Sequence, residues 1–74
     1  MATFPVTDEN GHTYADAKEL SEAVEWLERD AGYLRRQASL YRDPAVKERV
    51  MQNAERSNQY ALRLRRLGQL SRNP

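Results

Sequence analysis

The longest regular pattern of apolar positions begins just after residue 13 and predicts a long amphipathic helix. Apolar residues recur there at alternating spacings of three and four: Ala17, Leu20, Val24, Leu27, Ala31, Leu34, Ala38 and Tyr41. This is the a/d pattern of a coiled-coil helix, continued for more than three heptads. We expect the helix to span residues 14–41, with Thr13 as N-cap and Asp16 completing a capping-box pair. Gly32 lies beside the seam, where a small residue favours a close helix approach.

A second helix, antiparallel to the first, is predicted over residues 44–67. Asp43 is placed to accept hydrogen bonds from its first amides, and Pro44 lacks the amide that would go unused there. Only residues 42–43 link the two helices, so the chain is expected to fold back on itself. The second seam consists of Val46, Val50, Asn53, Ser57, Tyr60, Leu64 and Leu67, with Ala54 and Ala61 alongside.

The middle and the end of the second helix each pose a question. Asn53 and Ser57 interrupt the seam, either as buried polar residues that fix the register or oligomeric state, or as a solvent-exposed stretch. Gly68 is expected to be the C-cap, and residues 68–74 are expected to fray.

The first 13 residues form a separate leader. Phe4 and Val6 alternate with polar residues and proline, and Asn10-Gly11 favours a hairpin turn because both residues tolerate positive φ. Two readings of residues 1–13 stay open: a short β-hairpin that lies on the helices, or an irregular arm that covers them.

The first helix carries more apolar surface than one partner helix covers. Trp26, Tyr33 and Leu40 are seven residues apart and widen its apolar face. A 74-residue chain without a disulfide or metal also has little core of its own. We therefore predict an all-α fold, an antiparallel two-helix hairpin that dimerises into a four-helix bundle. The alternative is that the N-terminal arm folds over Trp26 and Tyr33. This layout resembles Rop-type hairpin dimers, a resemblance of pattern that implies no function.

The charges are nearly balanced overall but unevenly placed. Twelve Lys and Arg oppose eleven Asp and Glu, which argues against an acidic nucleic-acid mimic and against a strongly basic nucleic-acid coat. Acidic residues gather in the first helix and arginines near the end of the second. An antiparallel hairpin then sets three glutamates beside three arginines: Glu22, Glu25 and Glu28 with Arg63, Arg65 and Arg66.

Residues that carry catalytic or metal chemistry are scarce. The chain has no cysteine, one histidine and three glycines, and no phosphate-binding or nucleophile motif. His12 is expected to be a solvated turn residue, and pairs such as Glu22 and Glu25 a solvated helix face. We predict no enzymatic activity, no cofactor and no metal. With no signal peptide and no apolar stretch of roughly 18 to 20 residues, the expected location is the cytoplasm, with no membrane partner.

The leading functional prediction is a non-catalytic interaction protein, a helical homodimer that binds and modulates another protein. The expected contact residues are of the types enriched at binding hot spots, together with a leucine: Trp26, Tyr33, Leu40, Arg29 and Arg36. If the dimer uses these residues, the target site moves to the leader or to Leu62 and Met51. Such a chain suits a phage- or mobile-element-encoded inhibitor of a host protein, and equally a bacterial adaptor or regulator.

Two alternatives belong to other classes of function. Arginine binds phosphate in a bidentate manner, so a nucleic acid or a small anionic ligand is one alternative. Its contacts would be Arg56, Arg63, Arg65 and Arg66. The other is a structural subunit whose function is its oligomer.

Overall fold

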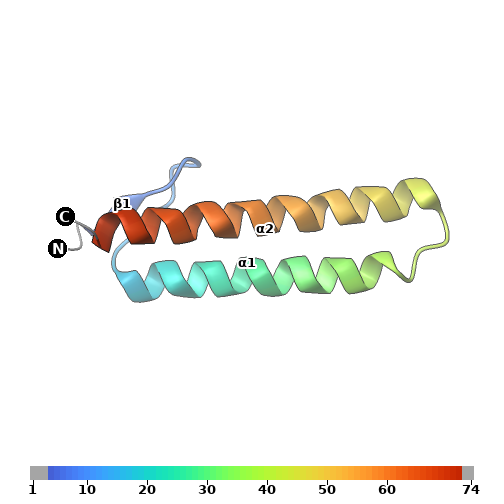
Figure 1. Ribbon diagram of the computed structural model, residues 1–74, viewed down its shortest axis with the longest axis horizontal. Helices are drawn as coiled ribbons and strands as arrows, with labels where there is room; N and C mark the ends of the chain where they lie inside the picture. Colours follow the sequence, from blue (N-terminus) through green and yellow to red (C-terminus); the bar gives the residue numbers. More distant parts are fainter. Residues whose placement is uncertain (1–3, 73–74) are drawn as a thin grey trace.

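The computed structural model describes residues 4–72 and shows a long helical hairpin with a short β-hairpin at one end (Figure 1). In chain order the elements are β1 (Val6–Thr7), β2 (Thr13–Tyr14), α1 (Ala17–Ala38) and α2 (Pro44–Arg72). The two helices lie side by side, and the molecule measures 49 × 18 × 17 Å. The predicted two-helix hairpin is confirmed, and the leader adopts the β-hairpin rather than the irregular arm.

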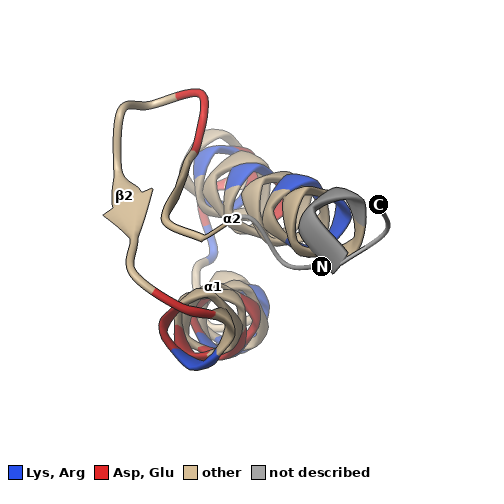
Figure 2. Cartoon of the chain, turned by 90° about the vertical axis from the view of Figure 1, so that its left-hand side faces the viewer, with Lys and Arg blue, Asp and Glu red and all other residues tan. Residues whose placement is uncertain are grey.

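The β-hairpin is closed by a turn that depends on Gly11. Val6 pairs with Tyr14 and Thr7 with Thr13 in antiparallel register. The Gly11 N–H donates to the Asp8 carbonyl at 3.1 Å, and Gly11 takes a φ of 85°, which glycine adopts without steric cost. Seen along the helices, the hairpin lies to one side of the helix pair (Figure 2).

α1 begins three residues later than predicted, because Tyr14 is used by the sheet. Thr13 is not the N-cap, since it lies in β2 with its hydroxyl 3.0 Å from that of Thr7. The N-cap is Asp16, whose carboxylate accepts from the Glu19 N–H at 2.8 Å. Glu19 in turn accepts from the Ala15 N–H at 2.8 Å, so two N–H groups at the helix start are satisfied reciprocally.

α1 also ends earlier than predicted, at Ala38 rather than at residue 41. The Ser39 hydroxyl donates to the Arg36 carbonyl at 2.7 Å, and Leu40 N–H bonds to the Gln37 carbonyl three residues back. These bonds tighten the last turn and lengthen the connection from residues 42–43 to residues 39–43. The predicted start of α2 is confirmed: the helix begins at Pro44, and Asp43 accepts from the Ala45 N–H at 2.9 Å.

The predicted roles of the two helical glycines, Gly68 as a C-cap and Gly32 as the point of close helix approach, were wrong. α2 passes through Gly68 and continues to Arg72, so Gly68 is not a C-cap and residues 68–72 are helical; residues 73–74 lie outside the described residues. A Cβ on Gly68 would lie 2.9 Å from Leu20 Cδ2, whereas one on Gly32 would meet nothing within 4 Å. The close helix approach is therefore at Gly68, and packing there overrides the weak helix propensity of glycine.

The core is concentrated at the β-hairpin end. Its buried members come from all four elements: Val6, Tyr14, Leu20, Val24, Ala61 and Leu64. Farther along, the buried apolar residues between the helices are the alanines Ala31, Ala38 and Ala54. Asn53 and Ser57 are the two polar residues that interrupt the second seam. Asn53 is exposed, whereas Ser57 is partly buried and its hydroxyl donates to the Asp30 carboxylate at 3.0 Å. Among residues 4–72, no asparagine is buried, so none sets the register in that way.

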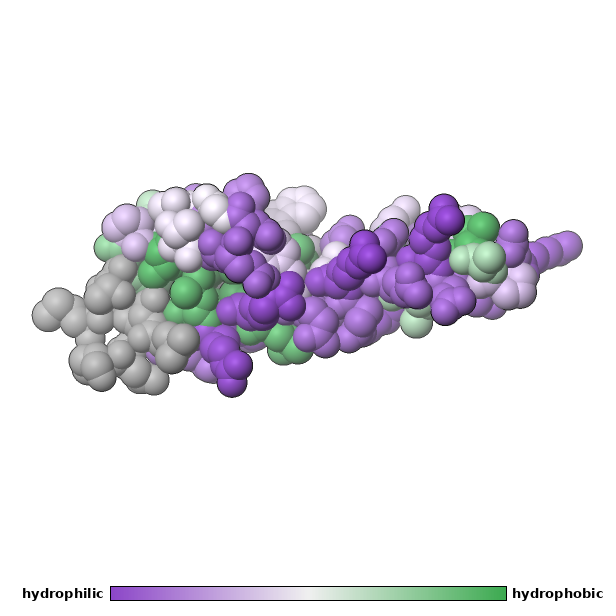
Figure 3. Space-filling model, turned by 90° about the horizontal axis from the view of Figure 1, so that it is seen from above, coloured by the Kyte–Doolittle hydropathy of each residue, from purple (hydrophilic) through white to green (hydrophobic). Residues whose placement is uncertain are grey.

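Seen from above, hydrophilic residues cover most of the face along α2, and hydrophobic ones gather near the β-hairpin (Figure 3). The larger hydrophobic area on this face lies at the same end of the molecule as the core.

The two helical glycines differ in a testable way. Replacing Gly32 with alanine removes the entropic penalty of glycine without a clash, so we expect the free energy of unfolding to rise by about 0.5–1 kcal/mol. In Gly68→Ala the same gain is offset by displacement of the buried Leu20 side chain, so the stability should be unchanged or lower. Urea unfolding of both variants measures the difference, and equal stabilisation would contradict the close approach at Gly68.

Candidate protein interface

One face of α1 is fixed against α2, which determines what the opposite face presents. Leu20, Val24, Ala31 and Ala38 are buried. Trp26, by contrast, is 71% exposed. The rotation of α1 is therefore set by its inner contacts, and the residues on its outer side project into solvent.

The outer side of α1 carries a second pattern at alternating spacings of four and three. Its members, which we call the outer seam, are Glu22, Trp26, Arg29, Tyr33 and Arg36. Successive members are neighbours on a helix surface because they are three or four residues apart. All five are exposed, and charged residues alternate with aromatic ones.

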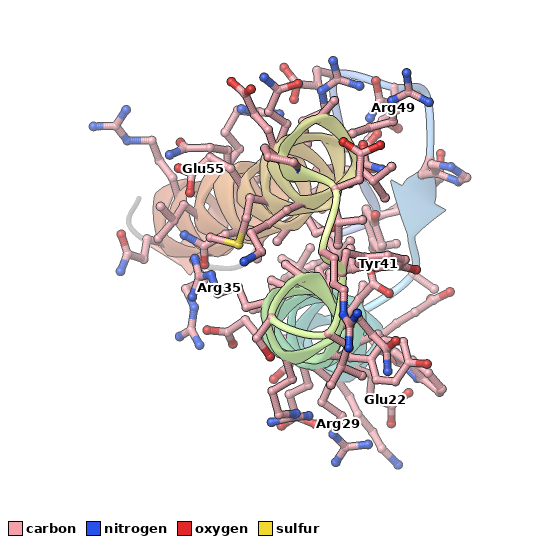
Figure 4. All side chains as sticks on the ribbon, turned by 90° about the vertical axis from the view of Figure 1, so that its right-hand side faces the viewer. Glu22, Arg29, Arg35, Tyr41, Arg49 and Glu55 are labelled. Atoms are coloured by element: carbon pink, nitrogen blue, oxygen red, sulfur yellow. The ribbon has the colours of Figure 1, made fainter. Side chains whose placement is uncertain are left out.

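Figure 4 shows that Glu22 and Arg29 extend from the side of α1 that faces away from α2. Trp26 lies four residues after Glu22 and three before Arg29, so the same side of the helix carries its ring. Within residues 4–72, neither Glu22 nor Arg29 makes an ion pair. The outer seam therefore presents aromatic rings beside charged groups that form no ion pair within the described part of the chain.

The structure places four of the five predicted interface residues on this seam, namely Trp26, Arg29, Tyr33 and Arg36. Leu40 is different: it is 72% exposed but lies beyond the end of α1, in the connection. Trp26 and Tyr33 are exposed, so the β-hairpin does not cover them, in contrast to the alternative considered for the arm. Sequence reasoning missed the place of Glu22, although its spacing of four and seven residues from Trp26 and Arg29 was visible.

Two of the four arginines proposed for anion binding form ion pairs within the chain. Arg63 forms an ion pair with Glu9 in the β-hairpin, and Arg65 pairs with Glu28 of α1 at 2.6 Å. Arg56 and Arg66 are exposed on α2, seven and three residues from Arg63. Of the predicted ion pairs along the hairpin, Glu28 with Arg65 is confirmed. Glu22 and Glu25 form none among the described residues, because Glu22 lies on the outer side.

A further ion pair of α1 with α2, not anticipated, joins Arg35 to Glu55 at 3.9 Å. Both side chains are about half exposed, so it contributes little to stability.

The β-hairpin is attached to α2 through a hydrogen-bonded cluster of one carboxylate and two tyrosines. Its members are Asp8 and Tyr60, which are partly buried, and Tyr14, which is buried. The Tyr14 hydroxyl donates to Asp8 Oδ2 at 2.8 Å, and the Tyr60 hydroxyl of α2 donates to the same oxygen. Asp8 Oδ1 accepts from the backbone N–H groups of Asn10 and His12 at 2.9 and 3.0 Å. One carboxylate thus closes the turn and ties it to the helix.

These contacts shift the pKa values of Asp8 and Tyr14. Burial by itself raises the pKa of Asp8, but the hydrogen bonds from Tyr60, Tyr14, His12 and Asn10 together outweigh it and lower the pKa from 3.8 to about 2. Burial raises the pKa of Tyr14, and its hydrogen bond to the Asp8 carboxylate raises it further. Nothing in the sequence pattern singled out Asp8, because Tyr60 is 52 residues away.

Other features of the described residues bear on metal, membrane and pocket sites. Among residues 4–72, no group of three or more His, Cys, Asp or Glu is arranged to hold a metal ion. In the same part of the chain, neither helix combines the length and apolar character needed to cross a membrane. His12 is exposed in the turn. A groove of about 300 Å³ lies between the ends of α1 and α2 and is lined by Phe4, Leu20 and Gly68 among others.

No family model, curated protein or solved structure matches this chain. Its function is therefore inferred from the geometry of its own residues.

The Asp8 cluster predicts how stability depends on pH. Because folding lowers the pKa of Asp8, its contribution is present above pH 4 and is lost as the pH falls from about 4 to 2. Asp8→Asn should lower the free energy of unfolding at pH 6 by about 1–2 kcal/mol, allowing for screening of this partly exposed group, and by less at pH 2.5. Denaturant titrations at both pH values measure this. Glu25→Gln, at an exposed position without an ion pair in the described chain, is the control, and a constant Asp8→Asn difference would contradict the assignment.

Proposed function

We propose that this chain is a non-catalytic interaction protein that self-associates as a helical homodimer and, in that form, binds and modulates another protein. The observation that carries the proposal is the outer seam, where Trp26 and Tyr33 are 71% and 54% exposed beside Arg29 and Arg36. Trp, Tyr and Arg are the residue types that dominate binding energy at protein interfaces. Leaving two large aromatic rings in water is unfavourable, and a partner relieves that cost.

The dimensions of the chain support association. A compact chain of 8.6 kDa exposes about 4,700 Å². This chain exposes 5686 Å², an excess of about 1,000 Å² that is comparable to the roughly 800 Å² each partner buries in a standard interface. Its radius of gyration, 14.8 Å, also exceeds the roughly 11 Å of a compact domain of this length. Elongation leaves one long side of α1 without a covering element.

A dimer built on the outer seam leaves other apolar residues for a target. Met51 and Leu62 are 44% and 51% exposed on α2. They are eleven residues apart, about three turns, and so share one side of that helix. Small anionic ligands have less support, because Arg63 and Arg65 are already ion-paired within the chain.

Two measurements test self-association: the mass by light scattering, and the fluorescence emission of Trp26, the one tryptophan of the chain. We expect a mass near 17 kDa by light scattering, twice the 8.6 kDa of one chain, at low and high salt. On dilution the Trp26 emission should shift to the red as the dimer dissociates and the ring returns to water. A mass of 8.6 kDa throughout, with red-shifted emission at every concentration, would refute the homodimer.

Substitutions separate the dimer surface from the target surface. Tyr33→Ser should weaken the dimer by about tenfold or more, since it removes a ring that the seam buries. Leu62→Ser removes an exposed apolar side chain of α2 and serves as the matched control, with the dimer retained. We expect Leu62→Ser to lose binding of the modulated protein while keeping its mass near twice that of the chain. A dimer that weakens equally in both variants would place the interface elsewhere.

A further inference from the structure

The outer seam presents aromatic rings and arginine side chains next to one another along one side of α1. Read from its start, it alternates charged and aromatic residues as Glu22, Trp26, Arg29, Tyr33 and Arg36, at spacings of four, three, four and three. The seam between α1 and α2 differs from it, because its buried positions are apolar. A partner that offers cations to the rings and rings to the arginines would match this alternation.

We propose that two copies dock through α1 in antiparallel orientation, so that the arginines of each outer seam lie against the aromatic rings of the other. This inference rests on the proposed self-association and specifies its geometry. Residues of antiparallel helices face each other when their numbers add up to a constant. A sum of 62 sets Trp26 opposite Arg36 of the second copy and Arg29 opposite its Tyr33.

The register with a sum of 62 places more favourable contacts along the outer seam than the register one heptad away. With a sum of 62, the spacings of the two copies match, and all four aromatic rings of the dimer meet an arginine. Shifting by one heptad to a sum of 55 sets Tyr33 opposite Glu22 of the second copy, whose carboxylate repels the face of the ring. Arg guanidinium groups stack on aromatic faces, and their aliphatic stems cover apolar surface while the charged heads reach solvent.

Charge also selects the antiparallel orientation. The first part of α1, residues 17–28, carries four Glu and one Lys, for a net charge of −3. Residues 29–38 carry three Arg and one Asp, for a net charge of +2. Glu28 and Arg35 are ion-paired with Arg65 and Glu55 of α2, which leaves net charges of −2 and +1 for a second copy, and an antiparallel pair sets these halves against each other. An in-register parallel pair would set each half, and each charged seam residue, against its own copy, at a cost in repulsion.

Single cysteines in this cysteine-free chain report the geometry without altering the seam. Gly32 lies beside the outer seam, close to the two-fold axis that the register requires, and a Cβ there meets no atom within 4 Å. In the antiparallel dimer, Gly32→Cys therefore lies near its own copy. Glu25→Cys, on the same flank, lies about 20 Å along the helix axis from its copy.

We expect a short bis-maleimide to cross-link Gly32→Cys efficiently and Glu25→Cys poorly, at a concentration where light scattering shows each variant to be dimeric. A monofunctional maleimide confirms that both thiols react. Equal cross-linking at the two positions, or none at either, in a protein that is dimeric by light scattering would overturn this geometry and leave the homodimer standing. A chain that is monomeric at every concentration would instead remove the proposed function itself.

Charge reversal tests the arginine–aromatic contacts directly. Arg29→Glu combined with Arg36→Glu should raise the dissociation constant of the dimer at least tenfold, because carboxylates then face the rings. The matched control is Arg49→Glu with Arg56→Glu, which has the same charge change and the same spacing of seven on exposed positions of α2. We expect the control pair to remain dimeric. Similar weakening in both double variants would show a general effect of net charge and overturn the assigned contacts.

Discussion

The packing of Leu20, Val24 and Leu64 between the two helices is the constraint on which the other features depend. These large apolar side chains lie in the interface between the two helices. Val6 and Tyr14 of the β-hairpin belong to the same buried cluster. Because α1 has only one inner face to bury, this packing fixes the helix rotation. The aromatic and arginine side chains on the opposite side are exposed as a direct result.

The β-hairpin extends this small core rather than adding a second one. Two strands of two residues have little stability of their own, so they depend on their attachment to the helices. The Asp8 carboxylate supplies that attachment, since it accepts from the turn, from Tyr14 and from Tyr60 of α2. A few polar contacts thereby hold Val6 and Tyr14 over the end of the helix pair, where they shield Leu20 and Leu64 from water.

The helices were predictable because their signals are local and repeated. A sustained a/d pattern, an Asp-Pro helix start and an Asn-Gly turn each act within a few residues. Three details were not predictable, since each is decided by residues far apart in the sequence. Tyr14 joins the sheet and moves the helix start, Leu20 packs on Gly68 and lets α2 continue, and Asp8 meets Tyr60. The outer seam was predictable only in part. Its spacing can be read from the local sequence, but the exposure of its side chains depends on how α1 packs against α2.

The alanines between the helices make the hairpin uneven along its length. Ala31, Ala38 and Ala54 bury far less apolar area than Leu20 or Leu64, and every residue from 39 to 49 is exposed. Burial of this kind predicts that local opening costs least free energy at the connection and more toward the β-hairpin. We therefore expect the backbone amides of the last turn of α1 and the first turns of α2 to exchange with solvent before those near the β-hairpin.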